Sequence, residues 1–457
     1  MDRSIYNAFE QALGKHAVLT GAADCIAYGF DNSAYRQNPS MVLLPTNTDQ
    51  VQAAVNLARQ FKLPLTARGR GTNTTGASIP VANGIVMSFE RMNQIVRIAA
   101  DDRIAVVQPG VLNGDLQNAL AEFALFWPPD PTSAPYCSIG GNIACNAGGP
   151  RAVKYGATRD NVLALKAITG TGELVEFGAA TSKNASGFDL SRLLIGSEGG
   201  LALVVEATLK LSPKPAARQL LRALYRDVES AAHAVARLMN QPNTPSMLEF
   251  MDASAIALAR DIGGADLPDA GALLLIETDG DAEQLPQALQ KLSEIAHGEG
   301  CIDISVAQND AEQNQLLAAR KALSPALRSL ATGKINEDVV VPVSQVPALV
   351  RFVERLSAEQ RLLIVCFGHI GNGNVHVNIM YDKADAAQTA NAEHCAERLF
   401  TEVLALGGTL SGEHGIGLAK RAFMTQAFTP ATLAAMRGIK NLFDPDGILN
   451  PGKTLPD

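Results

Sequence analysis

From Pro45 onward, a helical hydrophobic pattern is followed by a short apolar run. Between positions 51 and 61, apolar residues recur at spacings of three and four, which predicts an amphipathic helix with Thr48 as its N-cap. The following LPLTA, residues 63–67, is typical of a strand. The pattern therefore predicts a strand that leads directly into the loop ARGRGTNTTGAS, residues 67–78.

The next hundred residues contain a long stretch without any period. Residues 127–156, WPPDPTSAPYCSIGGNIACNAGGPRAVKYG, are rich in Gly, Pro and Asn, and a long irregular segment inside a compact domain is usually functional. NVLALKAITGTGELVEFG, residues 161–178, predicts a β-hairpin with its turn at 170–172. The segment SPKP suits a domain boundary near residue 213.

Beyond residue 213, apolar runs and helical patterns alternate. This alternation predicts an α+β domain in which helices cover a sheet. The expected helices are 228–240, 283–297, 311–331 and 343–357, and the expected strands are 247–252, 271–278, 302–307, 336–341 and a pair at 362–380. A helical tail is predicted from about residue 385 to the end.

Composition limits the classes of function. A chain of 457 residues with 47% hydrophobic and 18% charged residues is large enough for two or three domains. Its net charge of −8, with no cluster of basic and aromatic residues, argues against nucleic-acid binding. We find neither a signal peptide nor a membrane-spanning run, so we expect a cytoplasmic protein or one peripheral to the inner membrane. Six cysteines without a regular spacing indicate reduced thiols.

Two glycine-rich loops could bind a large anionic ligand. The first has glycines at 69, 71 and 76 with Arg68 and Arg70 between hydroxyl side chains, and the second is SIGGNIACNAGG, residues 138–149. Their backbone N–H groups can converge on a phosphate. Neither loop matches GxGxxG or a P-loop, so ordinary connecting loops remain the alternative. Together they favour a cofactor with a pyrophosphate.

The strongest candidates for metal-binding residues are His369 and His376, in CFGHIGNGNVHVNI. On a continuous strand, positions seven apart face opposite sides, but GNGN predicts a turn that lets the imidazoles meet. Glu413 in SGEHGIG could complete a His/His/Glu set for zinc, manganese or iron(II), with an open coordination position. His414 could then act as a general base. Structural histidines and a non-haem iron oxygenase are the alternatives.

Basic residues in RKALSPALRSLATGKINEDVVVP could bind a carboxylate. Arg320 and Lys334 lie among apolar residues of an expected helix and its exit, and an arginine binds carboxylates in a bidentate manner. A solvated helix face is the alternative explanation for these charges.

Six segments, taken in order, resemble a known family over almost the whole chain. They are ARGRGTNTTGAS, PPDPTS with SIGGNIACNAGG, GSEGGLALVVEATL, GHIGNGNVHVN, GEHGIG and FDPDGILNPGK. They are similar to motifs of the FAD-linked oxidases of the vanillyl-alcohol oxidase type, in the branch of D-lactate and D-2-hydroxyglutarate dehydrogenases. The resemblance implies an α+β fold: an FAD-binding domain of two α+β subdomains (1–213), a substrate (cap) domain with an antiparallel sheet covered by helices (214–410), and a helical C-terminal segment (411–457). That last segment is expected to carry the metal and base motif and to return to the FAD domain.

The resemblance also implies roles for individual residues. His369, His376 and Glu413 would bind zinc or manganese, and His414 would be the catalytic base. Substrate would contact Arg320, Ser324, Lys334 and Asn378. FAD would be lined by Arg68, Gly69, Arg70, Gly71, Thr72, Asn73, Thr74, Thr75, Gly76, Ala77, Ser78, Pro129, Asp130, Gly140, Gly141, Asn142, Asn146, Glu198, Gly200, Val205 and Asn450. Members with covalently attached flavin carry a histidine in the first loop, where this chain has Thr72 and Asn73, so we expect non-covalent FAD.

The implied reaction is the oxidation of a D-2-hydroxy acid, with D-lactate to pyruvate first and D-2-hydroxyglutarate to 2-oxoglutarate second. The metal would polarise the hydroxyl, His414 would take its proton, and the hydride would pass to flavin N5. The sequence carries no haem, iron–sulfur or nicotinamide motif, so we expect an external electron acceptor such as a quinone, a cytochrome or an electron-transfer flavoprotein. A homodimer is the default oligomeric state. A non-catalytic FAD-binding subunit of a larger complex is a further alternative.

Overall fold

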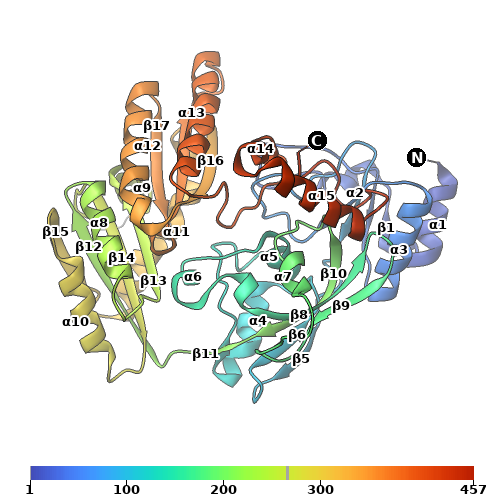
Figure 1. The fold of residues 1–457 in the computed structure, drawn as a ribbon, viewed down its shortest axis with the longest axis horizontal. Helices are drawn as coiled ribbons and strands as arrows, with labels where there is room; N and C mark the ends of the chain where they lie inside the picture. The colour runs from blue at the N-terminus through green and yellow to red at the C-terminus, as the bar shows by residue number, and fades with distance from the viewer. Residues whose placement is uncertain (1, 264–266, 457) are drawn as a thin grey trace. The chain divides into compact units, whose positions relative to one another are not determined.

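The protein divides into two compact units, each of mixed α and β structure. The structure is a computed structural model that describes residues 2–263 and 267–456. Unit 1 comprises Met1–Gly149, Gly156–Lys214 and Glu413–Asp457, and unit 2 comprises Pro150–Tyr155 and Pro215–Gly412 (Figure 1).

Unit 1 contains a small, mostly parallel sheet with the strand order β1-β2-β4-β3. Its strands are β1 Val18–Leu19, β2 Met41–Leu43, β3 Leu65–Arg68 and β4 Ile85–Ser88, and helices α1 Arg3–Leu13 and α3 Thr48–Gln60 pack beside it. The predicted helix is confirmed, because the apolar positions of α3 between 51 and 58 are buried. The predicted cap is wrong by one residue. Asn47, which is still extended, accepts a hydrogen bond from the backbone N–H of Gln50, whereas Thr48 is already helical.

The second sheet of unit 1 is antiparallel and has the order β5-β6-β10-β8-β9. Its strands are β5 Ile95–Ala99, β6 Ile104–Val107, β8 Val162–Thr169, β9 Leu174–Gly178 and β10 Ala202–Lys210. Strands β8 and β9 form the predicted hairpin. The C-terminal segment runs beside β3, where the backbone N–H of Leu65 donates to Ile448 O and that of Asn450 donates to Leu65 O (2.7 and 2.8 Å). This segment brings the last predicted motif to the first glycine-rich loop.

Three further helices and a short strand pair also belong to unit 1. Helices α4 Asn113–Leu120, α7 Leu190–Leu194 and α15 Pro430–Phe443 contribute apolar residues to the core around Trp127, and β7 Leu125–Phe126 pairs with β11 Ser212–Pro213. The expectation of an irregular stretch at 127–156 is wrong in part, since α5 Ile139–Cys145 of unit 1 and α6 Ala152–Tyr155 of unit 2 lie within it. Ser138 caps α5 through Gly141 N–H. Each helix is too short to show a hydrophobic period.

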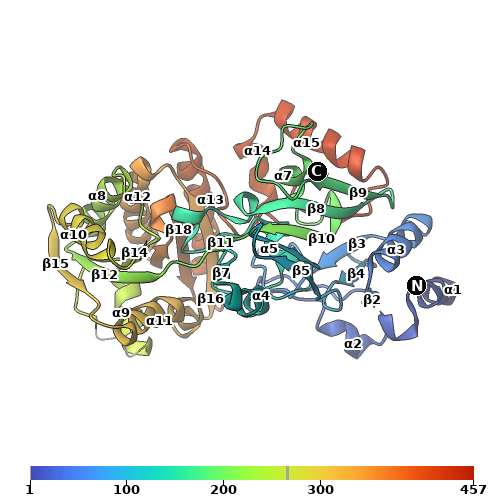
Figure 2. The same ribbon diagram turned by 90° about the horizontal axis from the view of Figure 1, so that it is seen from below.

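Unit 2 is built on an antiparallel sheet of seven strands in the order β15-β12-β14-β13-β17-β18-β16. The strands are β12 Ala217–Tyr225, β13 Met247–Asp252, β14 Ala272–Gly280, β15 Cys301–Val306, β16 Gly333–Val340, β17 Leu363–Gly368 and β18 Asn374–Tyr381. Helices α9 Ala253–Gly263 and α11 Asp310–Ala326 cover one face, and α8 Val228–Met239, α10 Leu285–Ala296, α12 Val346–Gln360 and α13 Ala386–Ala405 cover the other (Figure 2). The predicted sheet covered by helices is therefore confirmed.

Two predictions in the second half were incomplete. Strand β12 and helix α9 were not anticipated. The expected helical tail is interrupted, because between α13 and the short α14 Met424–Ala427 the chain has no α-helix. The glycines at 407, 408, 412, 415 and 417 in this interval disfavour a helix, and the loop that contains them carries Glu413 and His414.

A short peptide from the first half of the chain belongs to unit 2. Residues Pro150–Tyr155 bring Lys154 and Tyr155 to Asp279 on β14. The lysine forms an ion pair with the carboxylate and donates to the Asp279 backbone oxygen (3.1 Å), and the tyrosine hydroxyl donates to Oδ2 (2.8 Å). Arg151 lies 3.6 Å from the buried carboxylate of Glu277. Charged contacts thus fasten this peptide to the sheet.

The state of the cysteines and the hydropathy of the helices can be compared with the expectations of reduced thiols and of no membrane span. All six cysteines are free, and four of them are buried. None of the helices within residues 2–263 and 267–456 is both long and apolar enough to cross a bilayer.

Candidate active site

His369 and His376 meet because a tight turn separates them. Strand β17 ends at Gly368, a 3₁₀ turn covers 370–372, Gly373 adopts φ +73°, and β18 then returns antiparallel. A side chain at Gly373 would meet the backbone oxygen of Val341 at 1.9 Å, so the turn requires glycine. The two imidazole centroids lie 5.3 Å apart, with their planes at 87°.

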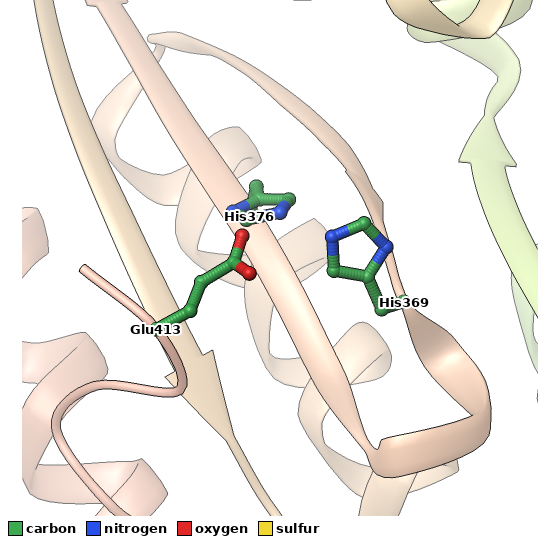
Figure 3. Close-up of side chains that lie close together, drawn as sticks. All are labelled: His369, His376 and Glu413. Atoms are coloured by element: carbon green, nitrogen blue, oxygen red, sulfur yellow. The ribbon is translucent and has the colours of Figure 1, made fainter. Parts of the chain in front are cut away.

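Glu413 completes a group that can bind a metal. Each of His369, His376 and Glu413 offers one ligand atom, and these atoms lie within 4.8 Å of one another. Figure 3 shows the glutamate carboxylate and both imidazoles pointing toward a common point. Glu413 directly follows Gly412, whose N–H donates to Asp338 (2.9 Å to Oδ2). Two nitrogens and one carboxylate fit a divalent metal that keeps an open coordination position.

A buried carboxylate lies behind each histidine. Asp338 on β16 is fully buried, lies 3.8 Å from His376 Nδ1, and accepts hydrogen bonds from Asn374 (2.5 Å) and Ser411 (3.1 Å). Glu249 on β13 lies beside His369. Sequence reasoning missed both residues, although a charge inside an otherwise apolar strand, as in MLEFMD and INEDVVV, is a usable signal.

Two of the four predicted substrate residues, Arg320 and Asn378, are connected to the candidate metal ligands. Arg320 is buried on α11, forms an ion pair with Glu249 (2.8 Å), and its guanidinium carbon lies 4.5 Å from the centre of the Phe367 ring. Asn378 on β18 is fully buried, donates to the backbone oxygens of Val365 and His376, and accepts from Asn336. It therefore braces the strand that carries His376.

The other two predicted substrate residues lie outside this network. Ser324 is exposed one helical turn after Arg320, and Lys334 is partly buried on β16. Among the described residues, neither side chain has a hydrogen-bond or ion-pair partner. Burial and the nearby positive charge of Arg328 lower the pKa of Lys334. Lys334 is thus a cation in a partly buried position without a carboxylate beside it.

Within unit 1, the loop that carries His414 is held from two sides. Asn73 Nδ2 donates to the backbone oxygen of His414 (2.9 Å). The buried Glu198 carboxylate accepts hydrogen bonds from the N–H groups of Ile416 (2.8 Å) and Gly417 (3.0 Å). Burial raises the pKa of Glu198, against the effect of these donors. Asn73 of the first glycine-rich loop and Glu198 of the GSEGG segment therefore fix the backbone around the candidate base.

The two glycine-rich loops lie against each other in unit 1. A side chain at Gly69 would meet Ser138 Oγ at 2.5 Å, and Asn73 Nδ2 lies 3.4 Å from Cys145 Sγ. Thr74 Oγ1 is buried with no hydrogen-bond partner in the described part of the chain. A buried hydroxyl without a protein partner fits a polar ligand at the loop, so these loops are compatible with FAD.

The two arginines of the first loop differ in their surroundings. Arg68 is buried and points toward the N-terminal segment, donating to Ala27 O (3.2 Å) and reaching Ser78 Oγ (3.5 Å), and burial lowers its pKa. Arg70 is more exposed and lies 4.0 Å from Glu90. Arg68 therefore braces the loop, while Arg70 is the more accessible charge.

Other predicted flavin residues are engaged within the fold of unit 1. Asn142 contacts Asn113 and Cys137, Val205 is part of a buried core, and Asn450 donates to the backbone oxygens of Ala77 and Glu198. The structure thus joins the end of the chain to the first loop and to the GSEGG segment.

Comparisons with known proteins establish the family. Residues 214–454 match the family model described as FAD linked oxidases, C-terminal domain, and residues 39–178 match the model described as FAD binding domain. The chain belongs to the FAD-linked oxidases. This FAD-linked oxidoreductase has curated relatives of similar length. It is 36% identical to the glycolate oxidase subunit GlcD of Bacillus subtilis over 94% of this chain and 92% of that one. It is 34% identical to the D-lactate dehydrogenase of Anaerostipes hadrus (92% and 90%) and to the D-2-hydroxyglutarate dehydrogenase of Stutzerimonas stutzeri (95% and 95%).

Solved structures share the fold at low identity. The FAD-linked oxidase superposes on p-cresol methylhydroxylase with a TM-score of 0.83 at 17% identity, covering 99% of this chain and 96% of that one. It superposes on alkyldihydroxyacetonephosphate synthase with a TM-score of 0.76 at 19% identity, covering 99% of this chain and 86% of that one. Both glycine-rich loops lie within the residues that match the FAD binding domain model, and membership of the FAD-linked oxidases argues against the alternative of a non-haem iron oxygenase.

Proposed function

We propose that this FAD-linked oxidoreductase oxidises a D-2-hydroxy acid to the 2-oxo acid, with D-lactate as the first candidate substrate. The observation that carries the proposal is the group of His369, His376 and Glu413, directly followed in sequence by His414. The D-lactate dehydrogenases of Anaerostipes hadrus and Archaeoglobus fulgidus are 34% and 33% identical to the chain. This combination suits an oxidation in which the proton leaves the hydroxyl oxygen and the hydride leaves the carbon that bears it.

Each residue has a distinct task in this proposal. His369, His376 and Glu413 would hold a zinc or manganese ion, which when bound supplies a Lewis acid for the hydroxyl oxygen. Non-covalent FAD, when bound, supplies the hydride acceptor. His414 takes the hydroxyl proton on an imidazole nitrogen. Arg320 offers a planar set of N–H donors to the substrate carboxylate.

The electrons must then leave the protein. We propose an external acceptor such as a quinone, a cytochrome or an electron-transfer flavoprotein, and a homodimer as the working oligomeric state. Both points are open to direct assay with the purified protein.

The decisive experiment is the visible absorption of the purified protein under anaerobic conditions, with separate additions of D-lactate, L-lactate, glycolate and D-2-hydroxyglutarate. We expect bleaching of a flavin band by D-lactate and not by L-lactate. Bleaching by glycolate alone would replace D-lactate with glycolate as the proposed substrate, in line with the name of the Bacillus subtilis relative. A flavin band that no 2-hydroxy acid bleaches would contradict the proposal and favour a non-catalytic subunit.

D-2-hydroxyglutarate is the second candidate because Lys334 could bind its distal carboxylate. A charge-assisted hydrogen bond contributes ~1.5–3 kcal/mol, so Lys334→Met should raise the KM for D-2-hydroxyglutarate about 10- to 100-fold and leave that for D-lactate unchanged. Because the pKa of Lys334 is lowered, the ammonium loses its proton at a lower pH than a free lysine. The KM for the dicarboxylate should therefore rise with pH below the usual lysine range.

The matched control is Lys321→Met, which removes an exposed lysine from the neighbouring helix. Steady-state kinetics of both variants between pH 7 and 10 provide the measurement. Equal effects of Lys334→Met on both acids would remove the role of Lys334 as a binder of the second carboxylate.

A further inference from the structure

Glu249 is a buried carboxylate at the centre of the unit 2 sheet, and both of its oxygens are engaged. It is 2% exposed. Oε1 lies 2.5 Å from His369 Nδ1, and Oε2 lies 2.8 Å from Arg320 Nη2. One side chain therefore joins a candidate metal ligand to the candidate binder of the substrate carboxylate.

The sheet fixes this arrangement. Strand β13 pairs antiparallel with β17 through Phe250 opposite Gly368, so Glu249 lies opposite the position of His369 at the end of that ladder. Side chains of alternate residues share one face, which places Glu249 on the face covered by α11, where Arg320 is located. The contact follows from strand register rather than from a mobile loop.

The contact also determines the tautomer of His369. A nitrogen that faces a carboxylate at hydrogen-bond distance carries the proton, so Nδ1 donates to Glu249 and Nε2 keeps its lone pair. Carboxylates behind metal-binding histidines orient the ring and increase its basicity. Glu249 thus presents the Nε2 of His369 as the ligand atom.

The same carboxylate leaves part of Arg320 available. Nη2 binds Glu249, whereas Nε is buried and has no hydrogen-bond partner in the described ranges. A guanidinium has five N–H donors in a rigid plane. The hydrogen bond from Nη2 to Glu249 therefore limits the directions in which the remaining N–H groups of Arg320 can point. Glu249 therefore orients the edge of Arg320 that a substrate carboxylate would use.

We propose that Glu249 is a positioning residue shared by the metal site and the substrate site, holding His369 in the tautomer that binds metal through Nε2 and holding Arg320 in the orientation that binds the acid. The second half rests on the proposed function, whereas the first concerns metal binding alone. A disturbance at Glu249 should therefore weaken both metal and acid binding, although Glu249 contacts neither.

The test is Glu249→Gln, with Glu277→Gln as the matched control. A glutamine has one acceptor oxygen and cannot satisfy both His369 and Arg320. Glu277 is a buried glutamate of the same sheet, 1% exposed, bound to Ser246 and to Arg151 and Arg218. The control removes an equally buried charge from unit 2 without touching the metal group.

The first readout requires no turnover. The metal-free proteins are titrated with Zn²⁺ or Mn²⁺ against a chromophoric chelator, and the Co²⁺-loaded proteins are compared by their visible absorption. We expect the affinity to fall about 10- to 100-fold in Glu249→Gln and the Co²⁺ bands to shift, with less than about twofold change in Glu277→Gln. The KM for the 2-hydroxy acid should rise in Glu249→Gln alone.

The outcomes separate this inference from the proposed function. Weaker metal binding in a protein that oxidises no 2-hydroxy acid would support the metal half and contradict the proposed function. Unchanged metal affinity in Glu249→Gln, equal loss in both variants, or no metal binding by the original chain would overturn the inference. If Glu249→Gln cannot be purified, Glu249→Asp keeps the charge on a shorter side chain, and unchanged metal affinity in that variant would also overturn it.

Discussion

Replacing His414 with asparagine should slow the reduction of the bound flavin by the 2-hydroxy acid ~10³-fold, because general base catalysis contributes roughly 10²–10⁴. The backbone around His414 is held by Asn73 and Glu198 through main-chain groups. The variant should therefore keep its loop, its flavin and its thermal stability while losing the proton acceptor. Anaerobic stopped-flow measurement of flavin bleaching gives the rate directly.

His394→Asn is the control for this prediction, since His394 is an exposed histidine on α13 with a side chain 56% accessible. It should reduce its flavin at the original rate. A rate for His414→Asn within about threefold of the original chain would show that another group takes the proton, since loss of the base is expected to cost far more.

Removal of the metal should abolish turnover and leave the flavin bound. His369 and His376 flank the β17–β18 turn, and Glu413 lies on a loop separate from the two glycine-rich loops. After dialysis against a strong chelator we expect kcat/KM for D-lactate to fall about 10³-fold, with the flavin spectrum unchanged. Addition of Zn²⁺ or Mn²⁺ should restore activity.

His376→Ala provides the matched test of this second prediction. It should retain flavin but regain no activity when metal is supplied, because one of three ligands is missing. Full activity in preparations that elemental analysis finds free of zinc, manganese and iron would contradict a role for the metal.

The candidate metal and base motifs could be found in the sequence because each is local. His369 and His376 are separated by a glycine-rich turn, and Glu413 lies beside His414. Each motif can therefore be recognised within a few consecutive residues. Their supporting residues are not local. Glu249 lies 120 positions before His369, and only the pairing of β13 with β17 brings them together. Hydrophobic periodicity predicts that a segment is a strand, but it does not predict which strands pair with each other.

Errors in the fold have similar causes. Strand β12 reads ARQLLRALY, a run of good helix formers whose intrinsic preference is overridden by pairing with β14 and β15 on its two sides. The interrupted tail shows the opposite case, in which local glycines end a helix that the apolar pattern alone would continue. The sheet covered by helices was predictable because its apolar runs are long.

The peptide Pro150–Tyr155 determines how unit 2 can be produced in isolation. A gene fragment that encodes only residues 215–412 would contain every strand of the seven-stranded sheet. It would nevertheless lack Lys154 and Tyr155, and the carboxylate of Asp279, whose side chain is 3% exposed in the full chain, would lose both partners. Removing the partners of a buried charge is destabilising, so such a fragment should unfold at a lower temperature than unit 2 in the full chain. A recombinant unit 2 needs this hexapeptide joined back to the sheet by a linker.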